Sequence, residues 1–168
     1  HRKVGIAYGS KEKRQQVINS DAEFVIINYD GVPIVEDDIA KANFDMVVID
    51  EANAYKTQTT RRWKALKAIL TPQTNLWMMT GTPAAQSPVD AYGLAKLVNP
   101  EGVPQFFTAW RDQVMNKITQ FKWAPKRGAE QVVSTLLQPA IRFTKEQCLD
   151  LPDLLYAERE VPMTAQQI

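Results

Sequence analysis

Asp50 and Glu51 have the residue types and the position best suited to chemistry, because they directly follow the apolar run 46–49. A continuous apolar run is typical of a strand buried on both faces of a parallel sheet. Open α/β sheets bind ligands at the carboxyl ends of such strands. One carboxylate can hold magnesium, and its neighbour can deprotonate an attacking water. The dipeptide taken alone is more typical of two solvated acids at the start of a loop.

Thr80, Gly81 and Thr82 form a second polar group behind an apolar run, residues 76–79. They offer two hydroxyls and a glycine that permits close backbone approach. If the two runs are neighbouring strands, these hydroxyls lie beside the two acids. The tripeptide alone is also typical of a turn with a good helix cap.

Short apolar runs alternate with helical segments along the first 100 residues. Ser10, Thr59 or Thr60, and Ser87 are typical helix caps, and the cations near residue 62 are expected on a solvated helix face. This alternation predicts an α/β architecture with a mostly parallel sheet. The predicted strands are residues 3–7, 24–27, 46–49 and 76–79, and the predicted helices are residues 11–19, 35–42, 60–70 and 88–98.

Beyond residue 100 the pattern favours helices. Apolar residues between 106 and 118 predict one or two amphipathic helices, and those at 132–137 predict another. Residues 155–161 suggest one more strand. The basic, aromatic stretch between the helices suits contacts with DNA phosphates and bases, but it also suits a helix end and loop whose rings pack inward. The side chains concerned are Lys117, Phe121, Lys122, Trp123, Lys126 and Arg127.

The composition excludes several classes of protein. The 168 residues carry 20 basic and 19 acidic side chains, so net charge neither requires nor excludes nucleic acid. With His1 and Cys148 as the only residues of their types, the chain cannot form a Ser-His-Asp or Cys-His arrangement, a structural zinc site or an internal disulfide. We expect Cys148 to be inert and partly buried. The lack of a possible disulfide fits a reducing, intracellular setting, so we expect a cytoplasmic or nucleoid-associated protein. No apolar run approaches the roughly 20 residues of a membrane span, so we expect no membrane partner.

Five segments resemble motifs of one family, in the family's order. Residues 48–53, Val-Ile-Asp-Glu-Ala-Asn, resemble motif II (the Walker B or DEAD/DEAH box) of superfamily-two helicases, and residues 79–83, Met-Thr-Gly-Thr-Pro, resemble motif III. Residues 26–30 are similar to motif Ib of the Swi/Snf-type branch. Residues 141–146 with Leu-Pro at 151–152 resemble the segment that leaves the first lobe, and residues 163–167 resemble the stretch that follows. The resemblance covers nearly the whole chain.

The resemblance implies a motor that uses ATP and Mg²⁺ and moves on DNA, expected to be double-stranded. Asp50 would hold Mg²⁺ through water, and Glu51 would activate the attacking water. The residues implied to couple the nucleotide to the grip on DNA are Asn53, Lys56, Thr80, Gly81 and Thr82. The residues implied to contact DNA are Asn28, Tyr29 and Arg142.

Three departures from the family pattern limit what the chain does alone. No glycine precedes a lysine, so the phosphate-binding signature GxxxxGK[ST] is missing. Asn53 stands where His or Gln is usual, and Phe143 replaces one Arg of a usual pair. We therefore expect an excised fragment whose phosphate loop lies upstream and whose second RecA-like lobe lies downstream in the same polypeptide.

The predicted fold is α/β, with an incomplete RecA-like sheet of the P-loop NTPase type, mostly parallel and flanked by helices, and a C-terminal helical subdomain. Residues 1–100 would form part of the first lobe, residues 101–140 a helical protrusion, and residues 141–168 a return segment and the start of a linker. The predicted function is that of a fragment of an ATP-dependent DNA helicase or translocase, inactive in isolation. The alternative is a non-catalytic α/β nucleic-acid-binding or scaffold domain derived from such a motor.

Overall fold

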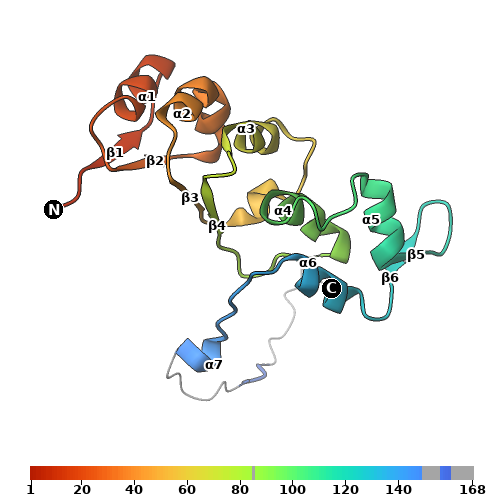
Figure 1. The fold of residues 1–168 in the computed structure, drawn as a ribbon. Coiled ribbons are helices and arrows are strands. Elements are labelled where there is room, and N and C mark those ends of the chain that lie inside the picture. Colours follow the sequence, from red (N-terminus) through yellow and green to blue (C-terminus); the bar gives the residue numbers. More distant parts are fainter. Residues whose placement is uncertain (85, 149–155, 160–168) are drawn as a thin grey trace, which may run out of the picture. The chain divides into compact units, whose positions relative to one another are not determined.

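The computed structural model describes residues 1–84, 86–148 and 156–159 and divides into two compact units, residues 1–138 and 139–168. In the described part, no helix is long and apolar enough to cross a membrane. The elements drawn in Figure 1 are, in chain order, β1 (Val4–Ala7), α1 (Lys11–Ile18), β2 (Phe24–Ile27), η1 (Tyr29–Ile34), α2 (Glu36–Ala42), β3 (Met46–Ile49), η2 (Ala52–Tyr55), α3 (Arg61–Ile69), β4 (Asn75–Met78), η3 (Pro88–Asp90), α4 (Ala91–Val98), α5 (Phe107–Val114), β5 (Met115–Lys117), β6 (Trp123–Pro125), α6 (Ala129–Leu136) and α7 (Lys145–Cys148).

Two parallel strand pairs, β1–β2 and β3–β4, confirm the predicted α/β class. Met46 lies opposite Asn75 and Ile49 opposite Met78, so β3 and β4 end at the same level. Each pair is a separate two-stranded sheet in the described residues, whereas the sequence suggested a single sheet. The segments that follow β3 and β4, which carry the predicted acids and hydroxyls, therefore leave one two-stranded sheet at the same level.

The helix caps follow from local sequence at two of three sites. The Ser10 hydroxyl accepts a hydrogen bond from the backbone N–H of Lys13 (3.4 Å), and the Thr60 hydroxyl accepts one from Trp63 (3.3 Å). Both bonds satisfy N–H groups that a first helical turn leaves free. Ser87 makes no capping bond, because the turn η3 comes between it and α4.

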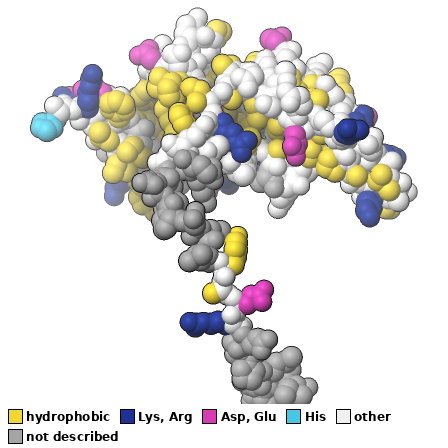
Figure 2. Space-filling view, turned by 90° about the horizontal axis from the view of Figure 1, so that it is seen from below, with side chains coloured by type: hydrophobic (Ala, Val, Ile, Leu, Met, Phe, Trp, Pro, Cys, Tyr) yellow, Lys and Arg dark blue, Asp and Glu magenta, His cyan; other side chains and the backbone are white. Residues whose placement is uncertain are grey.

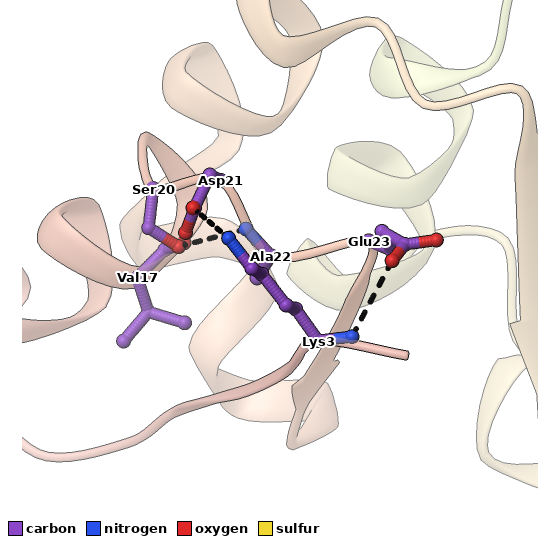
Figure 3. A network of polar contacts seen from close by, with 6 residues as sticks. All are labelled: Lys3, Val17, Ser20, Asp21, Ala22 and Glu23. Carbon is purple, nitrogen blue, oxygen red and sulfur yellow. Dashed lines mark hydrogen bonds and ion pairs between the residues drawn. The ribbon is translucent and has the colours of Figure 1, made fainter. Parts of the chain in front are cut away.

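The turn from α1 to β2 is tied to the residue that precedes β1 (Figure 3). The backbone N–H of Lys3 donates to the Glu23 carboxylate (3.5 Å), and its ammonium pairs with Asp21. The Ser20 hydroxyl donates to the carbonyl of Val17 (2.7 Å) at the end of the helix. These contacts set where β2 begins beside β1.

One face of the strands packs on helices and the other is exposed, so the prediction that β3 is buried on both faces is wrong. Val47 and Ile49 pack in a core with side chains of α1, α2 and α3, whereas Met46 and Val48 are 49% and 53% exposed. The three helices cover one face, and hydrophobic side chains gather in the view from the opposite side (Figure 2). The exposed apolar side chains on the strands and just after β4 are Val4, Ile6, Phe24, Ile26, Met46, Val48, Trp77 and Met79.

A second core joins α4, α5 and α6 to an antiparallel hairpin, β5–β6, that the sequence did not predict. Trp110 and Val114 of α5 are fully buried in it. The helix ends there because Met115 takes extended backbone angles (φ −126°, ψ 147°) and the N–H of Lys126 donates to the Val114 carbonyl (2.9 Å). The expected continuation of the helix to Ile118, which is 58% exposed, is therefore wrong.

The second unit, residues 139–168, contains α7. Cys148 is a free, exposed thiol, so the expectation that it is partly buried is wrong. Residues 156–159 form no strand. The rest of the strand suggested at 155–161, and the resemblances at 151–152 and 163–167, lie outside the described residues.

Candidate active site

The acids of motif II and the hydroxyls of motif III lie at one edge, as predicted. The N–H of Met79 donates to the carbonyl of Ile49 (2.8 Å), and the N–H of Ala52 donates to the carbonyl of Met79 (2.9 Å). These two bonds extend the β3–β4 ladder past the last strand residues. They fix Asp50 and Glu51 directly beside Thr80.

Glu51 has a backbone conformation that side chains rarely adopt. Its φ of 46° and ψ of 53° place it in the left-handed region, and its N–H donates to the Asp50 carboxylate (2.9 Å). A residue with a Cβ pays about 1–2 kcal/mol for this conformation. Such strain clusters at functional sites, where the surrounding structure holds it. Both carboxylates are exposed, and among the described residues neither forms an ion pair with a basic side chain.

Tyr29 contacts the backbone of motif II at Asp50, a contact that the sequence does not predict. Its hydroxyl donates to the backbone carbonyl of Asp50, and its ring packs edge-on against Tyr55 with 5.5 Å between ring centroids. Burial raises the pKa of Tyr29, and the nearby carboxylates of Asp50 and Glu51 raise it further. The only sequence signal was an aromatic residue two positions past β2. Tyr29 thus joins the end of β2 to the end of β3.

Asn28, another residue expected to contact DNA, accepts a hydrogen bond from the buried Arg14. Arg14 is 5% exposed, and its guanidinium donates to the carbonyls of Ala7 (2.8 Å) and Gly9 (3.0 Å) and to the Asn28 side-chain oxygen (2.9 Å). Three acceptors satisfy a charge that would otherwise be costly to bury. Nothing in the polar α1 sequence distinguishes Arg14 from its exposed neighbours.

Lys56 and Asn53 line an open pocket of about 420 Å³ between η1, η2 and α3. The Lys56 ammonium lies 3.6 Å from the carboxylate of Asp90. Arg62, also at this pocket, lies 3.1 Å from the carboxylate of Asp30, so it is not free on a solvated helix face as expected. Lys64 is exposed, as expected. The pairing of Lys56 joins motif II to the turn that begins α4.

The motif III loop is open on its outer side. The N–H of Thr82 donates to the Thr80 hydroxyl (3.3 Å), which shapes the loop as a tight turn. Gly81 and Thr82 are exposed, and no atom lies within 4 Å of where a Gly81 side chain would begin. The loop therefore leaves room for a ligand. Arg142 is exposed but lies in the second unit.

The acids at this edge suit a magnesium ion that a nucleotide helps to hold. No cluster of three or more His, Cys, Asp or Glu residues that could hold a metal occurs in the described part of the chain. Mg²⁺ does not require one, because it binds through one or two carboxylates, phosphates and water. Asp50 supplies an exposed carboxylate for the ion, and the adjacent, exposed Glu51 leaves a second carboxylate for proton transfer. The donor set fits Mg²⁺ bound together with a phosphate ligand.

The parallel strands β3 and β4 end at the same level, and acids and hydroxyls follow them. This arrangement is typical of α/β proteins, whose open sheets bind ligands at the carboxyl ends of the strands. The SNF2-related domain matches residues 3–168, so the chain belongs to that family. This confirms the Swi/Snf-type resemblance of the motifs.

Two curated relatives match about half of the chain. The SWI/SNF-related matrix-associated actin-dependent regulator of chromatin subfamily A-like protein 1 of Xenopus laevis is 33% identical over 81 residues, 48% of this chain and 8% of that protein. The protein of the same name from Xenopus tropicalis is 31% identical over 81 residues, with the same shares. The chain thus spans about 8% of the length of these relatives.

Proposed function

We propose that the chain is part of the first RecA-like lobe of a Swi/Snf-type motor that hydrolyses ATP and moves on duplex DNA. The observation that carries this proposal is the common edge of β3 and β4, where backbone hydrogen bonds hold Asp50 and Glu51 beside Thr80. Membership of the SNF2-related domain family supports it. So does the strained backbone of Glu51, since strain is kept where function requires it.

Asp50 and Glu51 have separate roles in this proposal. Asp50 would hold Mg²⁺ through water, and the ion, when bound, would neutralise charge on the phosphates. Glu51 accepts the proton of the water that attacks the terminal phosphate. Its left-handed backbone turns the chain away from β3, which keeps this carboxylate exposed at the edge rather than in the ladder.

The remaining motif residues transmit the nucleotide state. Thr80, Gly81 and Thr82 couple the nucleotide to the grip on DNA, and so does Asn53 in motif II. Lys56 connects motif II to the start of α4 through its ion pair with Asp90. DNA is contacted by Asn28, Tyr29 and Arg142. The link from the Tyr29 hydroxyl to Asp50 supports direct coupling between the DNA side and the ATP side.

Two further parts of the proposal concern what the chain needs for activity. Its seven glycines include no phosphate-binding loop, so residues elsewhere in the polypeptide hold the phosphates, and a second RecA-like lobe completes the motor. The 168 residues alone do not hydrolyse ATP. Steady phosphate release by the isolated chain, abolished by Glu51→Gln, would contradict this part.

The test uses the full-length polypeptide and the variant Glu51→Gln. We expect DNA-stimulated phosphate release to fall by about 10²–10⁴-fold, the usual contribution of a general base, while ATP binding is retained. Glu101→Gln, which changes an exposed glutamate in a distant turn, is the control and keeps the wild-type rate. Wild-type activity in Glu51→Gln would refute the role of Glu51. A wild-type protein that binds DNA without hydrolysing ATP would favour the non-catalytic alternative.

A further inference from the structure

The hairpin β5–β6 carries a concentration of positive charge that the motor motifs do not explain. Residues 117–127 contain four Lys or Arg side chains and no Asp or Glu. The whole chain has 20 basic and 19 acidic residues, so without these four its net charge would be negative. A local basic segment on a nearly neutral chain is the electrostatic footprint of an anionic partner.

The tip of the hairpin presents an aromatic ring to solvent. Phe121 is 89% exposed, although the sequence left open that it packs inward. The tip is an ordered turn, because the Thr119 hydroxyl accepts hydrogen bonds from the N–H groups of Phe121 (3.3 Å) and Lys122 (3.0 Å), and the N–H of Ile118 donates to the Lys122 carbonyl (2.9 Å). The turn therefore holds the ring outside the core.

Trp123 and Lys126 anchor the hairpin to the rest of the molecule. Trp123 packs against the second core, with the Arg111 guanidinium 4.0 Å from the centre of its ring. The Lys126 ammonium donates to the carbonyl of Asp112 at the end of α5 (2.6 Å). Trp123 and Lys126 therefore hold the hairpin in place and are not the binding groups.

The remaining cations are available to a ligand. Lys117, Lys122 and Arg127 are exposed, and none has an acidic partner within 4 Å in the described part of the chain. At the end of the molecule where Figure 1 draws the hairpin, Figure 2 shows Lys and Arg side chains next to hydrophobic ones. Lys122 adjoins Phe121 in the chain and Lys117 lies opposite Trp123, whereas Arg127 follows β6 at the other end of the hairpin. Exposed cations along a hairpin that also carries an exposed ring are what the phosphates and an unstacked base of one strand require.

We propose that this hairpin binds single-stranded DNA, with Phe121 stacked on an unpaired base and Lys117, Lys122 and Arg127 on the flanking phosphates. The proposal takes DNA as the partner from the proposed function and assigns a site separate from the acids at the β3–β4 edge. A single strand fits better than a duplex, because the bases of a duplex already stack on one another and offer no free face to the ring.

The test measures binding of the full-length polypeptide to a fluorescently labelled thymidine oligonucleotide of about 20 nucleotides, longer than typical single-strand footprints, and to a duplex of equal length. We expect Phe121→Ala to weaken binding to the single strand about tenfold, within the range found for base stacking, and to leave duplex binding unchanged. Phe106→Ala, which removes a ring that is 66% exposed outside the hairpin, is the matched control and changes neither.

The cations are tested by salt dependence. Replacing Lys117, Lys122 and Arg127 together by Ala should reduce the slope of log affinity against log salt on the single strand by about 0.7 for each phosphate that the variant no longer neutralises, whereas Lys67→Ala on α3 should not change it. Unchanged single-strand affinity in Phe121→Ala, or an equal weakening on the duplex, would overturn the proposal. Failure of the proposed function would appear separately, as absent ATP hydrolysis with Phe121-dependent single-strand binding intact.

Discussion

Glu51 allows a direct measurement of the strain at the proposed active site. Its backbone lies at φ 46° and ψ 53°, a region where a Cβ crowds the following carbonyl. Replacing Glu51 by Gly removes the Cβ and with it a cost of about 1–2 kcal/mol. Glycine also makes the unfolded chain more flexible, which costs about 0.4–1 kcal/mol. We therefore expect Glu51→Gly to raise the free energy of unfolding by roughly 0.5–1 kcal/mol, the difference of these terms.

The matched control is Glu101→Gly. Glu101 is also an exposed glutamate in a turn, but its φ is not positive. This substitution should only increase the flexibility of the unfolded chain and lower the free energy of unfolding by about 0.4–1 kcal/mol. The two variants should thus differ by roughly 1–2 kcal/mol, which at a urea m-value of about 2 kcal/mol per molar separates their unfolding midpoints by about 0.5–1 M.

Urea unfolding of both variants, monitored by tryptophan fluorescence, measures this difference in unfolding midpoint. Equal destabilisation by the two substitutions would refute the strained backbone at Glu51. Glu51→Asn provides a second check, since asparagine tolerates the left-handed region better than most residues. In the full-length polypeptide, Glu51→Gly should be more stable and yet lose ATP hydrolysis, as expected when a strained residue is kept for function.

Two further predictions concern stability. Burial raises the pKa of Tyr55 to about 12. The folded state thus favours the neutral phenol, and this contribution to stability is complete below about pH 10 and is lost as the pH rises towards 12. Wild type should lose up to about 2 kcal/mol more than Tyr55→Phe across that interval in urea unfolding, and equal slopes would contradict the assignment. Gly93 in α4 lies so close to η2 that an added Cβ would be 2.2 Å from the Lys56 carbonyl oxygen. Gly93→Ala should therefore destabilise the protein by about 1–3 kcal/mol despite better helix propensity, whereas Gly81→Ala should stay within about 0.5 kcal/mol of wild type; thermal unfolding that ranks them otherwise would show that α4 can move away.

Local sequence was sufficient for features that depend on near neighbours. The strand limits at 24–27 and 46–49 and the caps Ser10 and Thr60 agree with the structure. Each depends on periodicity or on a hydrogen bond within one helical turn, which the nearest residues specify. The motif sequences likewise identified the family, because their order along the chain is itself a sequence property.

Other features required the tertiary structure. One of them is the hairpin β5–β6, where the apolar spacing of residues 106–118 suits a helix and the basic, aromatic stretch suits either a DNA contact or a helix end and loop. The strands depend on the packing of Trp123 and on the hydrogen bond from the Lys126 N–H to the Val114 carbonyl. The exposed face of β3 was also missed, because an apolar run does not reveal how many faces other elements cover.

At the candidate active site, sequence alone determined which residues are present and that Asp50, Glu51 and Thr80 follow strands. The structure decided that these strands pair in parallel and end at the same level. It also decided that Tyr29 reaches Asp50 and that Glu51 takes a left-handed backbone. The physical reason is that a residue's type and order belong to the chain, whereas its neighbours and backbone strain depend on segments distant in sequence that meet only when the chain is folded.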